Sequence, residues 1–311
     1  MMQQSLILVG KGKLEWKRKA LESIEKDEVL IQTIAGAISI GAELPQYKES
    51  DVTDLNPKYP RETGYESFGR VIEAGEDVLE INVGDHVLAF YGHKDYGVVK
   101  ADKVVKVPET IDYTYALLNT LSCDSAKGVM KLKPDKLDHV LVTGSGTMGL
   151  LTLHFLKEYM NVEKVDVLEP NKARGKLAKT FGANNVYLSE EEVPREHYKC
   201  GFECSSSKNA FDAILKALKH NGEVCVLSDG NKDVFSLNED FYKKELKIVG
   251  SSDGWDYQQH SQWFFENIKK LEYVNSIFES HIHSHELIDC FAYLSETNEC
   301  PIKVLVRYPG S

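Results

Sequence analysis

A glycine-rich turn between an apolar strand and a helix constrains this chain most. Residues 139–143 form a short apolar run, the turn Gly144-Ser-Gly-Thr-Met-Gly149 follows it, and residues 150–156 repeat leucine and phenylalanine with a helical period. In this strand–turn–helix context, G-x-G-x-x-G is typical of a loop that holds the diphosphate of a dinucleotide. The sequence therefore predicts a nucleotide-binding βαβ unit here, with a chance glycine turn in an αβ crossover as the alternative.

Each glycine of the turn has a separate role. Gly144 permits the tight turn, Gly146 lets the backbone approach a pyrophosphate, and Gly149 lets the helix pack closely on its strand. The phosphates would lie at the helix N-terminus, where free N–H groups and the helix dipole favour anions. The predicted cofactor-binding residues of the turn are Gly144, Ser145, Gly146, Thr147, Met148 and Gly149.

Two further positions extend the predicted cofactor site. Glu169 ends the strand at 164–168 and lies 20 residues after Gly149, where an acid is expected on the ribose hydroxyls. Its carboxylate would accept hydrogen bonds from a ribose diol and repel a 2′-phosphate, so NAD is favoured, although the nearby Arg174 keeps NADP possible. Ser205 follows the strand at 199–204, at the edge where a ribose or nicotinamide would lie.

The order of expected elements divides the chain in two. Residues 5–110 contain many short β-branched runs, which predict an antiparallel β domain, and a helix is expected over 113–131. From residue 139 strands and helices alternate, which predicts a doubly wound parallel sheet with its ligand at the carboxyl edge of the strands. Two strands near the end could extend this sheet or return to the first domain. The other expected segments are strands at 5–9, 28–34, 69–74, 86–90, 103–107, 185–188, 222–227, 246–249, 275–283 and 302–307, and helices at 172–181, 210–219, 257–271 and 285–294.

Bulk properties exclude several classes of partner. The chain has 311 residues, and 37 basic against 48 acidic residues give a net charge of -11, which disfavours nucleic acid and anionic membranes. Its first residues lack the basic region of a signal peptide, and no apolar run is long enough to span a membrane, so a cytoplasmic protein is expected. None of the six cysteines forms a C-x-x-C motif, and Cys200 and Cys204 are predicted to be core residues of one strand.

Several separate motifs together resemble one known family. They are Gly64-Tyr-Glu-Ser-Phe-Gly-Arg-Val-Ile-Glu-Ala-Gly75, Val83-Gly-Asp-His-Val-Leu-Ala89, the Gly144 turn and Phe181-Gly-Ala183. Their order is similar to that of the medium-chain dehydrogenase/reductase superfamily, the alcohol dehydrogenase-like group. The resemblance implies a GroES-like catalytic domain (1–117, with a C-terminal return at 272–311), a Rossmann domain (118–271), an active site in the cleft between them, and a homodimer through the Rossmann domain.

The zinc ligands of that family are missing. Zinc-dependent members carry a Cys-Gly-Thr-Asp-like segment, a Gly-His-Glu motif and a third ligand before the Rossmann domain; the matching segments here are Ser39-Ile-Gly-Ala-Glu-Leu44, Gly64-Tyr-Glu66, and Asn119 or Thr120. Catalytic zinc needs three thiolate, imidazole or carboxylate ligands, and only Glu66 and Glu43 qualify. The four-cysteine lobe of structural zinc is also absent, because a short connection joins residues 89 and 99. We therefore predict no zinc at either site.

The segment Gly36-Ala-Ile-Ser-Ile-Gly-Ala-Glu43, together with Gly-Tyr-Glu, is similar to a zinc-lacking branch of the family. This branch includes bacteriochlorophyllide dehydrogenase-like proteins and is functionally mixed, and nothing in the sequence indicates a chlorophyll substrate. The zinc-free quinone and enoyl reductases usually carry a small-residue Ala-x-x-Gly-x-x-Gly turn. The Gly144 turn followed by Glu169 looks more like the alcohol and polyol dehydrogenases.

Without a metal, a side chain must exchange the hydroxyl proton of an alcohol. Tyr65 takes the place of the zinc-binding histidine, so we hypothesise that it donates and accepts this proton or orients the substrate, aided by Ser39 and Glu43, with Glu66 in support. The alternative is that Tyr65 and Ile40 only fill the vacated metal pocket. The predicted catalytic residues are Tyr65, Glu66, Ser39 and Glu43.

For other polar residues, a structural role explains their positions at least as well as a catalytic or binding role. Cys123 and Asp124 could touch the cofactor or belong to a helix surface and core. His93, Lys94 and Tyr96 lie in the shortened loop and are expected mainly in solvent. His281, His283 and His285 alternate along a strand, where a solvent-facing row is more common than a metal site.

These observations favour a zinc-independent oxidoreductase that transfers a hydride between NAD(H) and a secondary alcohol, polyol or ketone of a small metabolite. Two alternatives stay open. One is an NADPH-dependent quinone or enoyl reductase, and the other is a nucleotide-binding protein without activity. The expected partners are a small-molecule substrate and a second copy of the chain.

Overall fold

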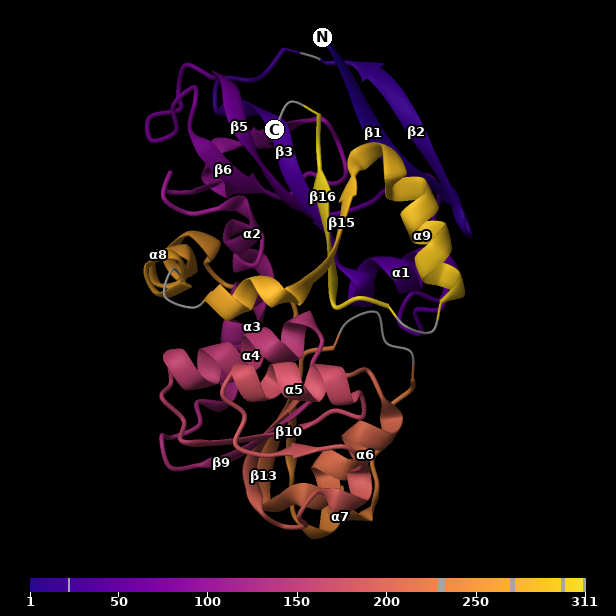
Figure 1. Ribbon diagram of the computed structural model, residues 1–311, viewed down its shortest axis with the longest axis vertical. Coiled ribbons are helices and arrows are strands. Elements are labelled where there is room, and N and C mark those ends of the chain that lie inside the picture. Colours follow the sequence, from indigo (N-terminus) through magenta and orange to yellow (C-terminus); the bar gives the residue numbers. More distant parts are fainter. Residues whose placement is uncertain (22, 229–232, 269–271, 298–299, 310–311) are drawn as a thin grey trace. The chain divides into compact units, whose positions relative to one another are not determined.

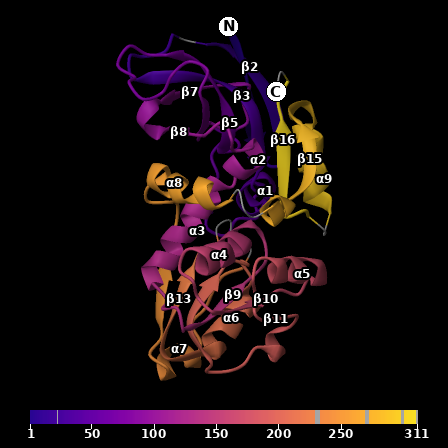
Figure 2. The same cartoon turned by 60° about the vertical axis from the view of Figure 1, so that its left-hand side comes forward.

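The computed structural model describes residues 1–21, 23–228, 233–268, 272–297 and 300–309. The chain forms two compact units, residues 1–119 with 257–311 and residues 120–256 (Figures 1 and 2). This grouping places the helix Tyr257–Ile268 in the first unit, whereas the sequence-based boundary at residue 271 assigned it to the second. The last residues of that expected helix, 269–271, lie outside the described residues. The boundaries of the functional domains stay a prediction.

The first unit is built on antiparallel strands. One sheet has the order β15-β16-β3-β5-β6-β8, with β7 also paired to β3, and a smaller sheet has the order β2-β1-β4. The β15–β16 pair is parallel. Its strands are β1 (Met2–Gly10), β2 (Lys13–Ala20), β3 (Glu28–Ile38), β4 (Arg61–Glu62), β5 (Glu66–Ala74), β6 (His86–Ala89), β7 (Tyr96–Lys100), β8 (Val105–Lys106), β15 (Phe278–His283) and β16 (Lys303–Arg307). Its helices are α1 (Ile40–Lys48), α2 (Tyr113–Ala116), α8 (Tyr257–Ile268) and α9 (Leu287–Glu296), with 3-10 turns at Ala101–Lys103, Glu272–Ile277 and Ser284–Glu286.

The second unit is a doubly wound α/β sheet. Its six strands run in the order β11-β10-β9-β12-β13-β14, and every neighbouring pair is parallel. Counted along the unit this is 3-2-1-4-5-6, the order of dinucleotide-binding sheets. The strands are β9 (His139–Thr143), β10 (Lys164–Leu168), β11 (Val186–Tyr187), β12 (Tyr198–Glu203), β13 (Leu218–Val226) and β14 (Lys247–Gly250). The helices are α3 (Asn119–Leu132, whose first residue belongs to the other unit), α4 (Thr147–Glu158), α5 (Lys172–Thr180), α6 (Lys208–Ala217) and α7 (Glu239–Lys243), with a 3-10 turn at Glu190–Glu192.

Local signals explain the helices of the second unit. The Asn171 side chain accepts hydrogen bonds from the backbone N–H groups of Ala173 and Arg174 at the start of α5, and the Ser207 side chain accepts one from Ala210 at the start of α6. At the other end of α6, the buried Lys244 donates to the carbonyl oxygens of Leu215, Lys216 and Leu218. An ammonium there satisfies carbonyls that the helix itself leaves unbonded and suits the negative end of its dipole.

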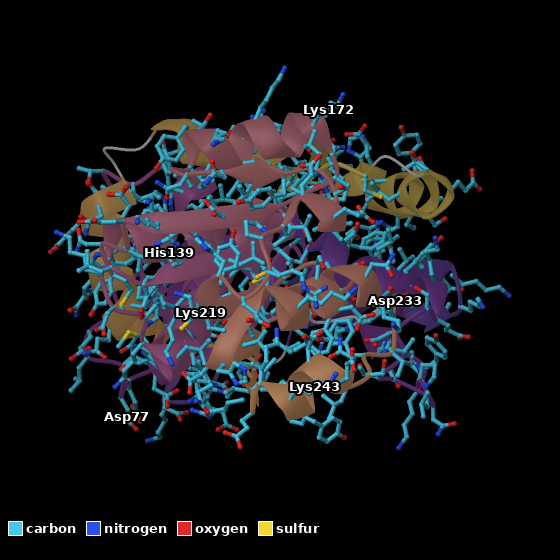
Figure 3. All side chains as sticks on the ribbon, turned by 90° about the horizontal axis from the view of Figure 1, so that it is seen from below. Asp77, His139, Lys172, Lys219, Asp233 and Lys243 are labelled. Atoms are coloured by element: carbon cyan, nitrogen blue, oxygen red, sulfur yellow. The ribbon has the colours of Figure 1, made fainter. Side chains whose placement is uncertain are left out.

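A pair of histidines lies at the edge of the parallel sheet where the strands begin. His139, labelled in Figure 3 with Lys219, starts β9, and its Nδ1 lies 2.6 Å from Nε2 of His197. Burial, together with His197, Lys164 and Lys219, lowers the pKa of His139. The positive neighbours disfavour a bound cation, and the glycine turn lies at the opposite, carboxyl edge of the sheet.

The expected α/β class, a β-rich part plus a doubly wound part, is confirmed. The two C-terminal strands, which the sequence left open, return to the first unit, because β16 pairs with β3. The expected helical stretch over 113–131 is present and is divided into α2 and α3. Two local expectations were wrong in part: within 103–107 only Val105 and Lys106 form a strand, and residues 275–277 belong to a 3-10 turn. Elements not expected from the sequence include β2, α1 and α7. Gly41 and Pro45 lower the helix propensity of α1, which is stabilised by packing of Tyr47 on Phe291.

None of the helices in the described part of the chain has the length and apolar character required to cross a membrane.

Candidate functional site

The glycine turn of the second unit has the geometry that its sequence predicts. Gly144 has a φ of +82°, a left-handed conformation that glycine adopts without strain. A Cβ atom at Gly149 would lie 1.9 Å from the carbonyl oxygen of Gly144, so only glycine lets α4 approach its strand this closely. A Cβ atom at Gly146 would meet nothing within 4 Å, so the space beside its backbone is open.

The start of α4 is suited to an anion. Its N-cap is Gly146, and no side chain makes a capping hydrogen bond there. The N–H groups of the first helical turn, which begins with Thr147 and Met148, have no intrahelical acceptor. Together with the helix dipole they form a site to which a phosphate would bind.

Glu169 is attached to the glycine turn. Its Oε2 accepts a hydrogen bond from the backbone N–H of Ser145 (2.7 Å), and its Oε1 accepts one from Asn171 (2.8 Å). The side chain is buried, yet each carboxylate oxygen can accept a further bond. The structure therefore places the predicted ribose-binding acid directly beside the predicted phosphate-binding loop.

Ser205 also lies against the turn. A Cβ atom at Gly144 would be 3.0 Å from the Cα and Cβ atoms of Ser205, and Ser205 Oγ donates to Oε1 of Glu203. Glu203 was not identified from the sequence, although its position at the end of a strand beside three serines was a usable signal. The predicted cofactor residues are thus neighbours in the structure, and their binding of a cofactor stays a proposal.

The first unit contains a buried polar cluster made of Ser39, Glu43, Glu66, His93 and Lys303. Ser39 Oγ donates to Glu66 Oε1, and Lys303 Nζ donates to the same carboxylate oxygen (2.7 Å) and to Ser39 Oγ (2.9 Å). The backbone N–H of Ser39 donates to Glu43 Oε1 (2.8 Å), whose Oε2 lies 2.9 Å from Nε2 of His93. Ser39 therefore links two carboxylates, each of which has a basic partner.

Three of the four predicted catalytic residues, Ser39, Glu43 and Glu66, belong to this cluster. Tyr65 precedes Glu66 and is half-buried, whereas all five members of the cluster are at most 6% exposed. Lys303 was not predicted at all. His93 was expected mainly in solvent, and this expectation was wrong, because its side chain is only 2% exposed.

Gly64 explains how the Gly-Tyr-Glu motif and His93 fit together. Gly64 has a φ of +77°, and a Cβ atom there would lie 2.7 Å from Cδ2 of His93. The backbone of the motif thus rests on the imidazole ring. Any larger residue would displace either the ring or the strand that begins at Glu66.

Burial dominates the electrostatics of Glu66. Removal from water raises the pKa of this carboxyl, although the charge and hydrogen bond of Lys303 and the hydrogen bond of Ser39 oppose the change. Within the described residues, Oε2 of Glu66 is buried and accepts no hydrogen bond. The carboxylate is therefore held on one side only, by Lys303 and Ser39.

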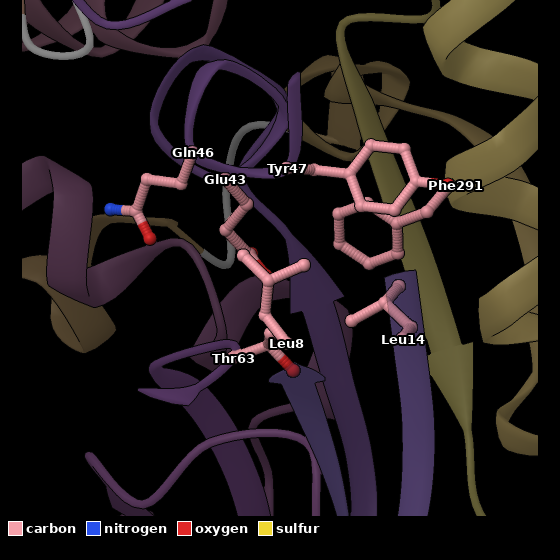
Figure 4. A pocket seen from close by; sticks show the side chains of 7 residues that line it. All are labelled: Leu8, Leu14, Glu43, Gln46, Tyr47, Thr63 and Phe291. Carbon is pink, nitrogen blue, oxygen red and sulfur yellow. The ribbon is translucent and has the colours of Figure 1, made fainter. Parts of the chain in front are cut away.

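A small cavity lies beside Glu43 (Figure 4). Its volume is about 10 Å³, which is room for one water molecule at most. It is lined by Leu8, Leu14, Glu43, Gln46, Tyr47, Thr63 and Phe291. A metabolite needs a pocket of roughly 300 Å³ or more, so this cavity is not a substrate site.

The remaining polar candidates lie outside these two groups. Cys123 is buried, its Sγ lies 3.6 Å from the carbonyl oxygen of Asp256, and burial raises its pKa to about 12, as for a core thiol. Lys94 pairs with Glu62 (2.6 Å). His281, His283 and His285 are exposed, and the rings of the last two stack with centroids 5.8 Å apart.

Comparison with known proteins identifies the family. A family model described as zinc-binding dehydrogenase matches residues 147–266. L-threonine 3-dehydrogenase of Pyrococcus horikoshii is 30% identical over 263 residues, which are 72% of this chain and 75% of the relative. The solved structure of 2R,3R-butanediol dehydrogenase from Bacillus subtilis has a TM-score of 0.82 at 19% identity, covering 98% of this chain and 99% of that one. L-idonate 5-dehydrogenase from Escherichia coli K-12 has a TM-score of 0.84 at 16% identity, covering 99% and 98%.

The parallel sheet with its glycine turn and the β-rich unit beside it in sequence have the α/β fold of these alcohol dehydrogenase-like structures. The chain belongs to the medium-chain dehydrogenase/reductase superfamily, as the resemblance implied.

Proposed function

We propose that this chain is an oxidoreductase that prefers NAD(H) and transfers a hydride between this cofactor and a secondary alcohol, polyol or ketone of a small metabolite, without zinc. The observation that carries the proposal is the attachment of Glu169 to the glycine turn through Ser145. This arrangement provides, side by side, an anion site for the pyrophosphate and a carboxylate for the adenosine ribose.

The choice of NAD over NADP follows from charge. A 2′-phosphate would have to lie beside the buried carboxylate of Glu169, which is already oriented by two backbone N–H groups. Repulsion between two anions in a partly desolvated site disfavours this arrangement. Bound NAD would supply the hydride acceptor, and the residues of the turn would hold and orient it.

The residues at the expected metal positions do not fit zinc. Ser39 and Tyr65 offer hydroxyl groups in place of thiolate and imidazole. The ammonium of Lys303 lies 2.9 Å from Ser39 Oγ, so a fixed positive charge stands beside the first ligand position and would repel a dication. In the described ranges no group of three His, Cys, Asp or Glu residues is arranged to hold a metal ion. These observations support assignment to the zinc-lacking branch.

The polar cluster would support Tyr65 in the proton chemistry of the proposed reaction. In the proposed oxidation the hydroxyl proton passes to a protein base as the hydride leaves the carbon atom, and we assign this proton transfer to Tyr65. Glu66 and Ser39, held by Lys303, would keep the adjoining strand in place, and Glu43 would do the same through the Ser39 backbone. The names of the relatives, which act on threonine, butanediol and idonate, support a hydroxylated metabolite as substrate.

Cofactor binding is the first test. Titration of the purified protein with NADH and NADPH, with zinc measured in the same sample, is expected to show tighter NADH binding and far less than one zinc per chain. The variant Glu169→Ala should reduce the preference for NADH, since it removes the charge that repels the 2′-phosphate. Preference of the wild type for NADPH would favour a quinone or enoyl reductase, and near one zinc per chain would refute the metal-free assignment.

The role of Tyr65 is tested by turnover on a panel of alcohols and ketones. Tyr65→Phe is expected to lower kcat by about 10²–10⁴-fold, because the phenol that exchanges the proton is removed. Tyr242→Phe, at an exposed position of α7, is the matched control and should keep full activity. A Tyr65→Phe variant within about threefold of wild type would rule out the catalytic role. Cofactor binding without turnover on any substrate would favour a non-catalytic protein.

A homodimer formed through the second unit and a cytoplasmic location stay predictions.

A further inference from the structure

Glu203 is a buried carboxylate that the proposed chemistry does not use. It is the last residue of β12 and is 0% exposed. Its Oε1 accepts hydrogen bonds from the backbone N–H of Ser205 (2.7 Å), from Ser205 Oγ (2.5 Å) and from the backbone N–H of Ser206 (3.0 Å). Its Oε2 accepts one from Ser228 Oγ, and Thr143 Oγ1 lies 3.4 Å from Oε1. One carboxylate thus joins the carboxyl ends of three neighbouring strands, β9, β12 and β13.

These bonds determine the shape of the turn at 205–207. Ser206 has a φ of +59°, a conformation that a residue with a side chain rarely adopts, and its N–H points at Glu203. Ser207 then caps α6. Without the carboxylate, the N–H groups of Ser205 and Ser206 would lose this acceptor, and the hydrogen bonds that offset the unfavourable conformation of Ser206 would be lost with it.

The same turn supports the glycine loop. Gly144 approaches Ser205 so closely that a Cβ atom would lie 3.0 Å from its Cα atom, and the carbonyl oxygen of Cys204 would be 3.2 Å away. In a sheet of this order the dinucleotide crosses the carboxyl edge at β9, with one half on each side. Glu169, after β10, lies on the side of the adenosine half. Glu203 and Ser205, after β12, lie on the other side.

We propose that Glu203 is a positioning residue for the nicotinamide riboside half of the cofactor. The inference rests on the proposed function and names the part of the cofactor that this turn receives. Ser205 and Ser228 donate their hydroxyl hydrogens to the carboxylate, so toward any other group their oxygen atoms act as acceptors; Ser205 Oγ already accepts the backbone N–H of Ser207 (3.2 Å) and can accept one further bond. Acceptors beside a buried anion suit the hydroxyl groups of a ribose or the amide N–H groups of nicotinamide, and they do not suit a phosphate.

The test compares a whole cofactor with its adenosine half. Affinities for NADH and for AMP are measured by calorimetry for the wild type and for Glu203→Gln, with Glu223→Gln as the control. Glu223 lies on the neighbouring strand β13, and its partner is the exposed Lys247. Glu203→Gln is expected to weaken NADH binding by about tenfold or more and to leave AMP binding within about twofold. The control should change neither affinity.

A second variant covers the case in which Glu203→Gln does not fold. Ser228→Ala removes one donor and keeps the carboxylate, so it should weaken NADH binding by a smaller factor, again without an effect on AMP. Equal weakening of NADH and AMP would mean that Glu203 only stabilises the unit, and unchanged NADH binding in both variants would equally overturn the proposal. A wild-type protein that binds neither ligand would refute the proposed function itself, and with it this inference.

Discussion

Replacement of Lys303 by methionine is expected to lower the free energy of unfolding by about 3–5 kcal/mol, as measured by urea denaturation. The Lys303 side chain is 0% exposed and that of Glu66 is 1% exposed, with 2.7 Å between Nζ and Oε1. Methionine keeps most of the volume but leaves Glu66 as a buried carboxylate without a cation. The cost of that uncompensated group, rather than the attraction within the pair, sets the size of the effect.

Two controls separate this explanation from a general loss of packing. Lys247→Met removes an ion pair of similar length with Glu223, but the lysine side chain is 61% exposed, so the expected change is at most about 1 kcal/mol. The double variant Lys303→Met/Glu66→Leu removes both charges and should recover a large part of the stability that Lys303→Met loses. A loss below about 1 kcal/mol in Lys303→Met, or no recovery in the double variant, would contradict the assignment of Lys303 as the cation that holds Glu66.

Acidification is expected to destabilise the protein by about 3 kcal/mol through His154 alone. His154 lies in α4 with 0% exposure, and burial lowers its pKa to about 4 from an ordinary value near 6.5. Between these two values the unfolded chain binds a proton that the folded chain does not. Stability from this residue is therefore complete above pH 6.5, falls as the pH decreases, and is lost by about pH 4.

The measurement is the free energy of unfolding of wild type and His154→Leu at a series of pH values from 7 to about 4. The difference between the two proteins isolates His154, because the carboxylates titrate alike in both. The exposed His281→Gln serves as the control and should follow the wild-type curve. Parallel curves for wild type and His154→Leu would show that folding does not lower the pKa of His154, and would contradict the prediction.

Much of the cofactor site could be predicted because it is contiguous in sequence. The glycine turn, the strand before it and the helix after it span residues 139–158, and Glu169 ends the next strand. The turn needs a positive φ at Gly144 and close packing at Gly149, and each requirement excludes a side chain at that position. Residue identity alone therefore determined the conformation of this segment.

The contacts of Glu203 and of the polar cluster could not be predicted from residue identity in this way. Glu203 follows its strand as Glu169 does, but nothing in the local pattern tells that Ser205, Ser206 and Ser228 direct their donors at it. Within the cluster, Lys303 is separated from Glu66 by 237 residues and His93 from Glu43 by 50. The resemblance of the Ser39 and Gly64 segments to the dehydrogenase family indicated Ser39, Glu43 and Glu66, but no motif in the sequence indicated Lys303.

By itself, the sequence determined the α/β class, the presence of a doubly wound parallel sheet and the position of its glycine turn, because these depend on the periodicity of apolar residues and on backbone freedom at single positions. Only the tertiary structure decided that the last strand, β16, pairs with β3 and brings Lys303 to Glu66 and Ser39. The physical reason is that the residues of a strand do not specify which other strand it pairs with. Register is chosen by the burial of whole sheets, and the charge that stabilises a buried carboxylate is supplied by whichever strand that burial places beside it.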